Sequence, residues 1–286
     1  MWRGDRSAML GGQERTTPRR EHTMHRTIIV AASEGRSLRD AFMLGTALAW
    51  PRGAELVLTR VDIGPARPVD DLQVLIASAP AGVIARAESV GAGSIVDGLH
   101  HAVTGAHAEL LVLGSTHLSA VGRAARGDVA LGAVRDAACA VAVAPAGYAE
   151  RASAGLRRIA VAHDGGPEAD EAFAWAVGLA ERTGGSVQLI HVLSPAEDES
   201  DVRAGLRARC DDVRPRVPAI YDVRRGEPAA SLAGGAELDL LVLGSHARGP
   251  LARLALGSVS SAVLRHAACP VVVLPRGVHA ALEPVA

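Results

Sequence analysis

Short, nearly continuous runs of Val, Ile, Leu and Ala alternate along the chain with longer segments in which apolar residues recur every three or four positions. In the second half of the chain the apolar runs are RIAVAH (158–163), SVQLIHV (186–192), VPAIYDV (217–223), LDLLVLG (238–244) and PVVVLP (270–275). Runs of this kind predict strands that are buried on both faces, and the periodic segments between them predict amphipathic helices. The alternation therefore predicts an α/β protein with a parallel sheet.

The longest periodic segment covers residues 167–184. Its small apolar residues and Phe173 share one helical face, and Gly184 stands just beyond the predicted end. Further helices are predicted over 197–213, 228–236 and 258–267.

The chain repeats itself after about 130 residues. TIIVAAS at 27–33 matches RIAVAHD at 158–164, and LLVLGS at 110–115 recurs unchanged at 240–245. The only two phenylalanines, Phe42 and Phe173, occupy equivalent positions. Such a period predicts two copies of one domain rather than a solenoid.

We expect a disordered tail at 1–24, a first domain at 25–149 and a second at 156–280. The tail lacks periodicity, and Met24 is an alternative start to Met1.

The loop after the fourth strand of each copy is the first candidate for binding chemistry. In a parallel sheet, ligands bind beyond the carboxyl ends of the strands, where the strand order reverses. In the second copy this loop closes with Gly257 and Ser258, which open a helix. Backbone N–H groups at a helix N-terminus bind anions, although a Gly-Ser pair before a helix is also ordinary capping sequence.

Composition excludes several functions. The formal net charge is −1, and all 30 basic residues are arginine. Without lysine, neither a Walker A loop nor a pyridoxal phosphate Schiff base can form. The chain has no long apolar span, no secretory signal pattern and no CxxC spacing among its three cysteines. We therefore expect a cytoplasmic protein that binds neither nucleic acid nor membrane.

Both copies resemble the universal stress protein family, in its tandem form. That family's nucleotide loop is similar to the segment in which Gly244 is the first glycine, Ala247 replaces the second, and Gly257 and Ser258 close the motif. Asp164 matches the acidic residue that ends the family's first strand, and His191 and Val192 match positions beside the adenine. The resemblance implies two five-stranded Rossmann-like domains, similar to adenine nucleotide alpha hydrolases. It also implies that ATP, with or without Mg²⁺, binds in the second copy.

The first copy departs from this pattern. Ser33 stands in place of Asp164, His117 replaces the second glycine, and the closing pair is Gly127 and Asp128. A carboxylate at the phosphate position repels an anion by roughly 4 kcal/mol at about 4 Å and an effective dielectric near 20. We expect this first site to hold no nucleotide.

The resemblance implies a stress-response regulator, not an enzyme, that binds an adenine nucleotide and an unknown regulatory protein partner. Two alternatives stay open: a slow ATP hydrolase that uses Asp164 with a divalent ion, and a scaffold without ligand. His100, His101 and His107 suggest a metal only weakly, because no carboxylate or thiol accompanies them at ligand spacing. Cys139 and Cys269 are predicted to be buried small hydrophobes.

Each copy ends in an apolar strand, at 140–145 and 270–275. An apolar edge strand tends to aggregate unless it is covered. We predict that these two strands pair antiparallel within one chain, with Val143 and Val272 near the join and both nucleotide loops facing away from it. The alternative is pairing between chains, as in a homodimer.

Overall fold

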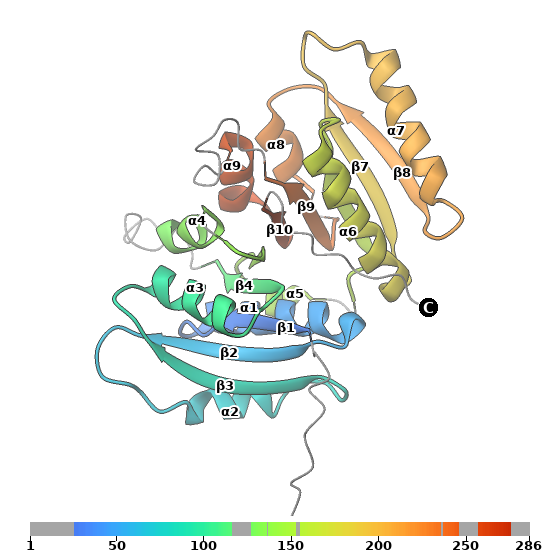
Figure 1. Cartoon of the computed structure of the whole chain (residues 1–286). Coiled ribbons are helices and arrows are strands. Elements are labelled where there is room, and N and C mark those ends of the chain that lie inside the picture. Colours follow the sequence, from blue (N-terminus) through green and yellow to red (C-terminus); the bar gives the residue numbers. More distant parts are fainter. Residues whose placement is uncertain are drawn as a thin grey trace, which may run out of the picture.

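The computed structural model describes residues 26–115, 127–135, 137–152, 155–235, 237–245 and 257–275. The predicted tail, His117 and Ala247 lie outside these residues. Ten strands in the described part form one continuous sheet in the order β3-β2-β1-β4-β5-β10-β9-β6-β7-β8 (Figure 1). No helix in these ranges has the length and apolar character needed to cross a bilayer.

The first five strands pair in parallel with one another. Their bounds are β1 (Thr27–Ala31), β2 (Glu55–Asp62), β3 (Ile84–Gly91), β4 (Leu110–Gly114) and β5 (Ala140–Ala144). The helical elements of this half are α1 (Arg36–Ala49), the 3-10 turn η1 (Trp50–Arg52), α2 (Asp70–Ile76), α3 (Ile95–Gly105), α4 (Gly127–Arg135) and α5 (Tyr148–Arg151).

The second half repeats this arrangement with the same strand order. Its strands are β6 (Arg158–Ala162), β7 (Ser186–Val192), β8 (Ala219–Arg224), β9 (Leu240–Gly244) and β10 (Val271–Leu274). Its helices are α6 (Pro167–Thr183), α7 (Glu199–Val213), α8 (Pro228–Ala233) and α9 (Ser258–His266). The predicted α/β class with two five-stranded parallel units is confirmed, while the exact domain boundaries stay predictions.

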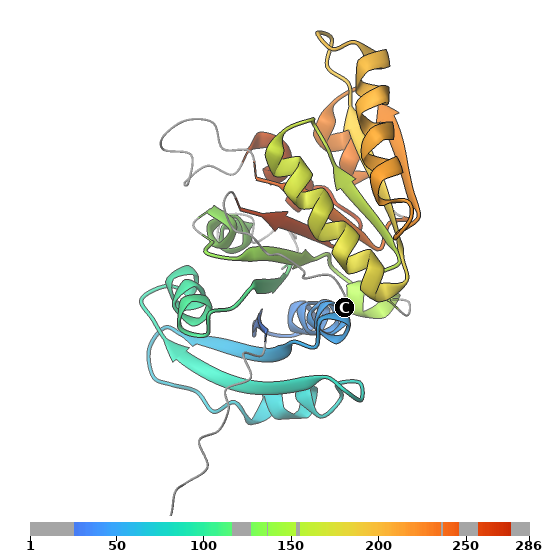
Figure 2. The same ribbon diagram turned by 45° about the vertical axis from the view of Figure 1, so that its right-hand side comes forward.

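Helices cover both faces of the sheet, and successive strand residues point to opposite faces. Ile28 and Val30 of β1 join one apolar cluster with α1, α6 and α7, whereas Ile29 joins the other with α3, α4 and α9. Figures 1 and 2 show α1 and α6 on one side of the sheet and α3 and α4 on the other. Burial on both sides explains why the strands read as continuous apolar runs.

Local sequence explains the two ends of α6. Pro167 occupies the first helical turn, where its missing N–H costs nothing. Gly184 follows the last residue with a left-handed φ of 63°, a conformation that glycine adopts without strain. The prediction of a helix at 167–184 is therefore confirmed at both ends.

The two halves meet where β5 and β10 pair antiparallel. Val271 lies opposite Val143, and Val272 lies opposite Ala142. Val272 is fully buried at this seam. The predicted antiparallel pairing within one chain is confirmed.

A second contact between the halves involves Arg52 of η1. Its guanidinium carbon lies 5.3 Å from the ring centre of Trp175 in α6, and its Nε donates to Glu109 at 3.0 Å. Burial lowers the pKa of Arg52, and the charge of Glu109 opposes that effect.

Candidate functional site

The residues predicted to bind nucleotide in the second half lie at one edge of the sheet. β6 has β7 on one side and β9 on the other, so the strand order reverses between β6 and β9. Asp164 follows β6, Val192 is the last residue of β7, and Gly244 is the last residue of β9. The topology brings these three positions to the same carboxyl edge, where parallel sheets bind ligands.

Asp164 is exposed in the turn that leads from β6 into α6. Its Oδ1 accepts the backbone N–H of Gly166 at 3.0 Å, a local bond that shapes the turn before Pro167. The carboxylate thus stands at the rim of the edge rather than in the core.

Gly244 has a packing function that the sequence did not reveal. A Cβ at this position would lie 2.6 Å from the backbone oxygen of Glu168 and 3.2 Å from the backbone nitrogen of Ala169. Those atoms belong to the first turn of α6. Glycine at 244 therefore lets α6 approach β9 closely, independently of any ligand.

Gly257 and Ser258 begin α9. Gly257 is the N-cap residue with φ −59°, and no side chain caps the helix within the described ranges. Ser258 is the first helical residue and is exposed, so it does not cap the helix through its hydroxyl. The first N–H groups of α9 consequently have no partner within the helix, which is the usual basis of anion binding at such an end.

A network of buried histidines supports this edge and was missed in the sequence. His163 Nε2 donates to Asp170 Oδ1 at 2.9 Å, and His163 Nδ1 accepts the N–H of Gly165 at 3.1 Å. Burial lowers the pKa of His163, and the bond to Asp170 opposes part of that shift. The ring is therefore held as the neutral Nε2–H tautomer.

His191 belongs to the same network. Its Nδ1 donates to the backbone oxygen of His163 at 2.7 Å, and its Nε2 lies 3.2 Å from Glu197 Oε1. The backbone N–H of Ser194 lowers the pKa of Glu197, and the bond to His191 acts in the same direction. The two positions matched to an adenine site thus differ in exposure. His191 is buried and hydrogen-bonded, whereas Val192 is half-buried at the carboxyl edge.

The other candidate residues have structural roles in the described part of the chain. His100 Nε2 lies 3.1 Å from the backbone oxygen of Ala133, and no group of three or more His, Cys, Asp or Glu side chains gathers there as a metal site. Cys139 and Cys269 are buried, as predicted, and burial raises the pKa of Cys139 to about 12.

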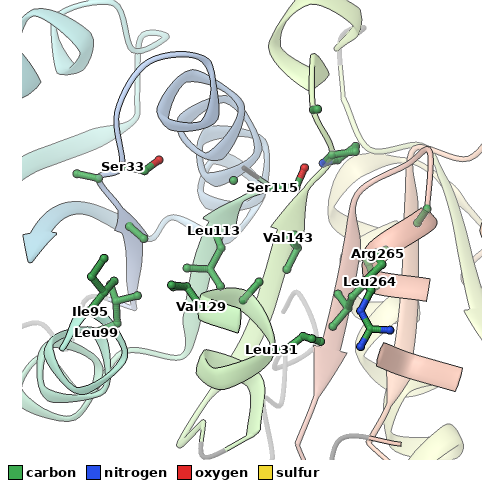
Figure 3. Close-up of a pocket in the computed structure, with 18 of the residues that line it drawn as sticks. Ser33, Ile95, Leu99, Leu113, Ser115, Val129, Leu131, Val143, Leu264 and Arg265 are labelled. Atoms are coloured by element: carbon green, nitrogen blue, oxygen red, sulfur yellow. The ribbon is translucent and has the colours of Figure 1, made fainter. Parts of the chain in front are cut away.

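A cavity of about 910 Å³ lies at the carboxyl edge of the first half. Apolar residues of β4, β5, α3 and α4 line it, together with Leu264 and Arg265 of α9 and Cys269 and Val271 from the second half (Figure 3). The loops that were predicted to face away from the seam lie largely outside the described residues. Their orientation therefore stays a prediction, although α9 contacts α4 and the cavity reaches across the seam.

The fold defines a two-part α/β protein with Rossmann-like halves. The sequence profile described as "Universal stress protein family" matches residues 155–275. A universal stress protein of Mycobacterium tuberculosis is 34% identical over 181 residues, which cover 58% of this chain and 61% of that protein. One of Thermus aquaticus is 30% identical over 136 residues, 42% of this chain and 98% of that protein.

Solved structures with a similar fold cover most of this chain. A universal stress protein from Archaeoglobus fulgidus aligns with a TM-score of 0.68 at 19% identity, over 88% of this chain and 96% of that one. The cytoplasmic domain of a prokaryotic cation chloride cotransporter aligns with a TM-score of 0.55 at 14% identity, over the same shares. These two likenesses concern the fold alone, since one fold hosts several functions.

This chain belongs to the universal stress protein family. It spans 61% of the length of the mycobacterial relative that it matches.

Proposed function

We propose that this chain is a cytoplasmic stress-response regulator that binds ATP, with its Mg²⁺, at the carboxyl edge of the second half. The observation that carries the proposal is the topology: Asp164 follows β6, Val192 ends β7 and α9 begins after β9, so all three belong to the carboxyl edge where the strand order reverses. An acidic rim, an apolar platform and a helix N-terminus are the three kinds of group that an adenine nucleotide needs.

Each residue takes a distinct part in this proposal. The first N–H groups of α9, beginning at Ser258, receive the phosphates, because Gly257 provides no side chain that would compete for them. Val192 packs against the base, and the Asp164 carboxylate accepts hydrogen bonds from hydroxyl or amino groups of the nucleoside. Gly244 contributes indirectly, since it sets the distance between β9 and α6.

The first half supports the same assignment by contrast. Ser33 and Asp128 replace the residues that correspond to Asp164 and Ser258. Exchanging these residue types between the halves is therefore a direct test of which positions bind nucleotide.

The test is a calorimetric titration of the full chain with ATP. We expect a single site per chain, and Ser258→Asp should weaken binding by about tenfold or more because its carboxylate faces the phosphates. Asp164→Ser should also weaken binding. Ser78→Asp is the matched control: it adds the same charge to an exposed residue between α2 and β3, at the far end of the sheet from β9, and should leave the affinity unchanged. Two sites per chain, or unchanged affinity in Ser258→Asp, would contradict the proposal.

Following ADP formation in the same samples separates the remaining alternatives. ATP that stays bound without turnover supports a regulator. ADP released over hours, and lost in Asp164→Ser, identifies a slow hydrolase. A chain that binds no nucleotide and still recruits partners is a scaffold.

A further inference from the structure

The cavity of the first half is built from both halves of the chain. Ile95 and Leu99 of α3 lie on one side of it and Leu264 and Arg265 of α9 on the other, with Leu113 of β4 between them (Figure 3). Its volume of about 910 Å³ lies within the range of sites for drug-sized molecules.

The lining is mainly apolar, and part of it is exposed. Ile95 retains 42% of its exposure at the mouth, whereas Leu99 and Val143 are buried below it. Exposed apolar surface inside a concave site favours binding of an apolar molecule, because binding removes that surface from water.

Three guanidinium groups line the cavity in the described part of the chain, and two of them are occupied. Arg67 pairs with Asp62 and with Glu34, and Arg151 donates to the backbone oxygen of Ala146 at 2.9 Å. Arg265 has no ion pair or hydrogen bond to any described residue, and it is exposed. Among the described residues that line the cavity, it is therefore the cation without a partner in the described part of the chain.

The position of Arg265 at the end of α9 also allows a purely structural explanation. A cation in the last turn stabilises the partial negative charge of a helix C-terminus. His266 already interacts with the C-terminus of α9, since its Nδ1 lies 2.8 Å from the backbone oxygen of Ala262. If Arg265 only stabilises the helix C-terminus, changing it should lower stability and leave ligand binding unchanged. This outcome separates the structural explanation from ligand binding.

We propose that this cavity binds a small amphipathic carboxylate, with its apolar body between α3, α4 and α9 and its carboxylate at Arg265. The ligand is distinct from the nucleotide proposed for the second half, and the inference does not depend on that proposal. The single unpaired cation among the described lining residues suits one carboxylate better than a polyphosphate, which carries several charges. Ser33 and Asp128, in place of the acidic rim residue and the helix-start serine, also disfavour a nucleotide here.

The probe is decanoate, with 1-decanol as its uncharged counterpart, titrated into the full chain below the micelle concentration. We expect saturable binding of decanoate at a single site, and weaker binding of decanol because it lacks the charge. Arg265→Gln should weaken decanoate binding by about tenfold, as expected for the loss of a charge-assisted hydrogen bond, and should leave decanol binding unchanged. Arg225→Gln is the control, because that arginine pairs with Glu199 on the exposed side of the second half.

A second variant fills the cavity and leaves the charge of Arg265 in place. Val129 lines the cavity from α4, and Val129→Trp should abolish binding of both probes while ATP binding stays as in the parent chain. Melting curves of both variants check whether the fold is retained, and we expect no change for Arg265→Gln because it alters only an exposed side chain.

Three results overturn the inference. They are no saturable binding of decanoate, equal decanoate affinity in the parent chain and in Arg265→Gln, and loss of ATP binding in Val129→Trp. Loss of ATP binding in Val129→Trp would place the nucleotide in this cavity. Failure of the proposed function gives a different result, because the parent chain itself then binds no ATP.

Discussion

Replacing Gly244 with alanine tests whether this glycine serves packing or phosphate binding. The added Cβ would lie 2.6 Å from the backbone oxygen of Glu168, whereas an ordinary contact begins near 3.4 Å. The first turn of α6 must therefore move by about 0.8 Å, and its neighbours in the sheet core resist that movement. Because the opposing atoms are backbone, no side-chain rotation relieves the overlap.

The magnitude follows from two opposing effects. Overpacking of this kind costs about 1–3 kcal/mol. Alanine also lowers the conformational entropy of the unfolded chain, which raises the free energy of unfolding by about 0.4–1 kcal/mol. The net loss for Gly244→Ala is about 1–2 kcal/mol, which lowers the melting temperature by about 2–8 °C in a chain of this size.

Two further glycines calibrate the measurement. Gly114 is the equivalent residue of the first half, where a Cβ would lie 2.0 Å from the backbone oxygen of Ser37, so Gly114→Ala should be more destabilising. Gly91, at the end of β3, has open space around it, so Gly91→Ala should melt like the parent chain.

The assay is thermal unfolding followed by circular dichroism in the absence of nucleotide. The packing argument is refuted if Gly244→Ala melts within about 1 °C of the parent chain, or if its effect equals that of Gly91→Ala. If Gly244→Ala keeps its stability and loses only ATP binding, the glycine serves phosphate binding instead of packing.

Val272→Lys places a charge in the seam: the halves should unfold in two separated transitions at unchanged mass in solution, and the exposed change Ile220→Lys should have no such effect. A drop from dimer to monomer mass with the halves still coupled would instead indicate pairing between chains. Burial raises the pKa of Cys139 to about 12, that of Cys269 to about 11 and that of Cys210 above its usual value, so none should react with a disulfide reagent at mildly alkaline pH until denaturant is added. Decanoate and ATP should change each other's affinity by the same factor, because α9 begins at the proposed nucleotide site and ends at the cavity; equal decanoate titrations with and without ATP would show that the sites are independent.

The fold could be predicted because its signals are local or pairwise. Pro167 and Gly184 mark the ends of a helix by their own backbone preferences, and the repeat of LLVLGS predicts that the second sheet copies the first. The seam followed from a different argument. An apolar edge strand needs a cover, and a second copy of the same edge in the chain provides one.

The site could be predicted only in part. Asp164 and Gly257 stand at motif positions, but the packing of Gly244 against Glu168 depends on the distance between two elements far apart in the sequence. The bond between His163 and Asp170 joins residues seven positions apart, and only the turn before α6 brings them together. Nothing in the residue pattern alone indicates such contacts.

The cavity was missed for a related reason, and this reason also explains why the two copies need each other. Its lining comes from both halves, and Leu131 and Leu264 line the same cavity because β5 and β10 pair antiparallel at the seam. That geometry is a pseudo-twofold arrangement, in which α4 and α9 contact each other across the seam while each also packs against its own half. A single copy would leave this cavity without the wall that α9 provides. A change in α9 therefore alters the surroundings of a cavity at the carboxyl edge of the first half, so the two copies are not independent as binding units.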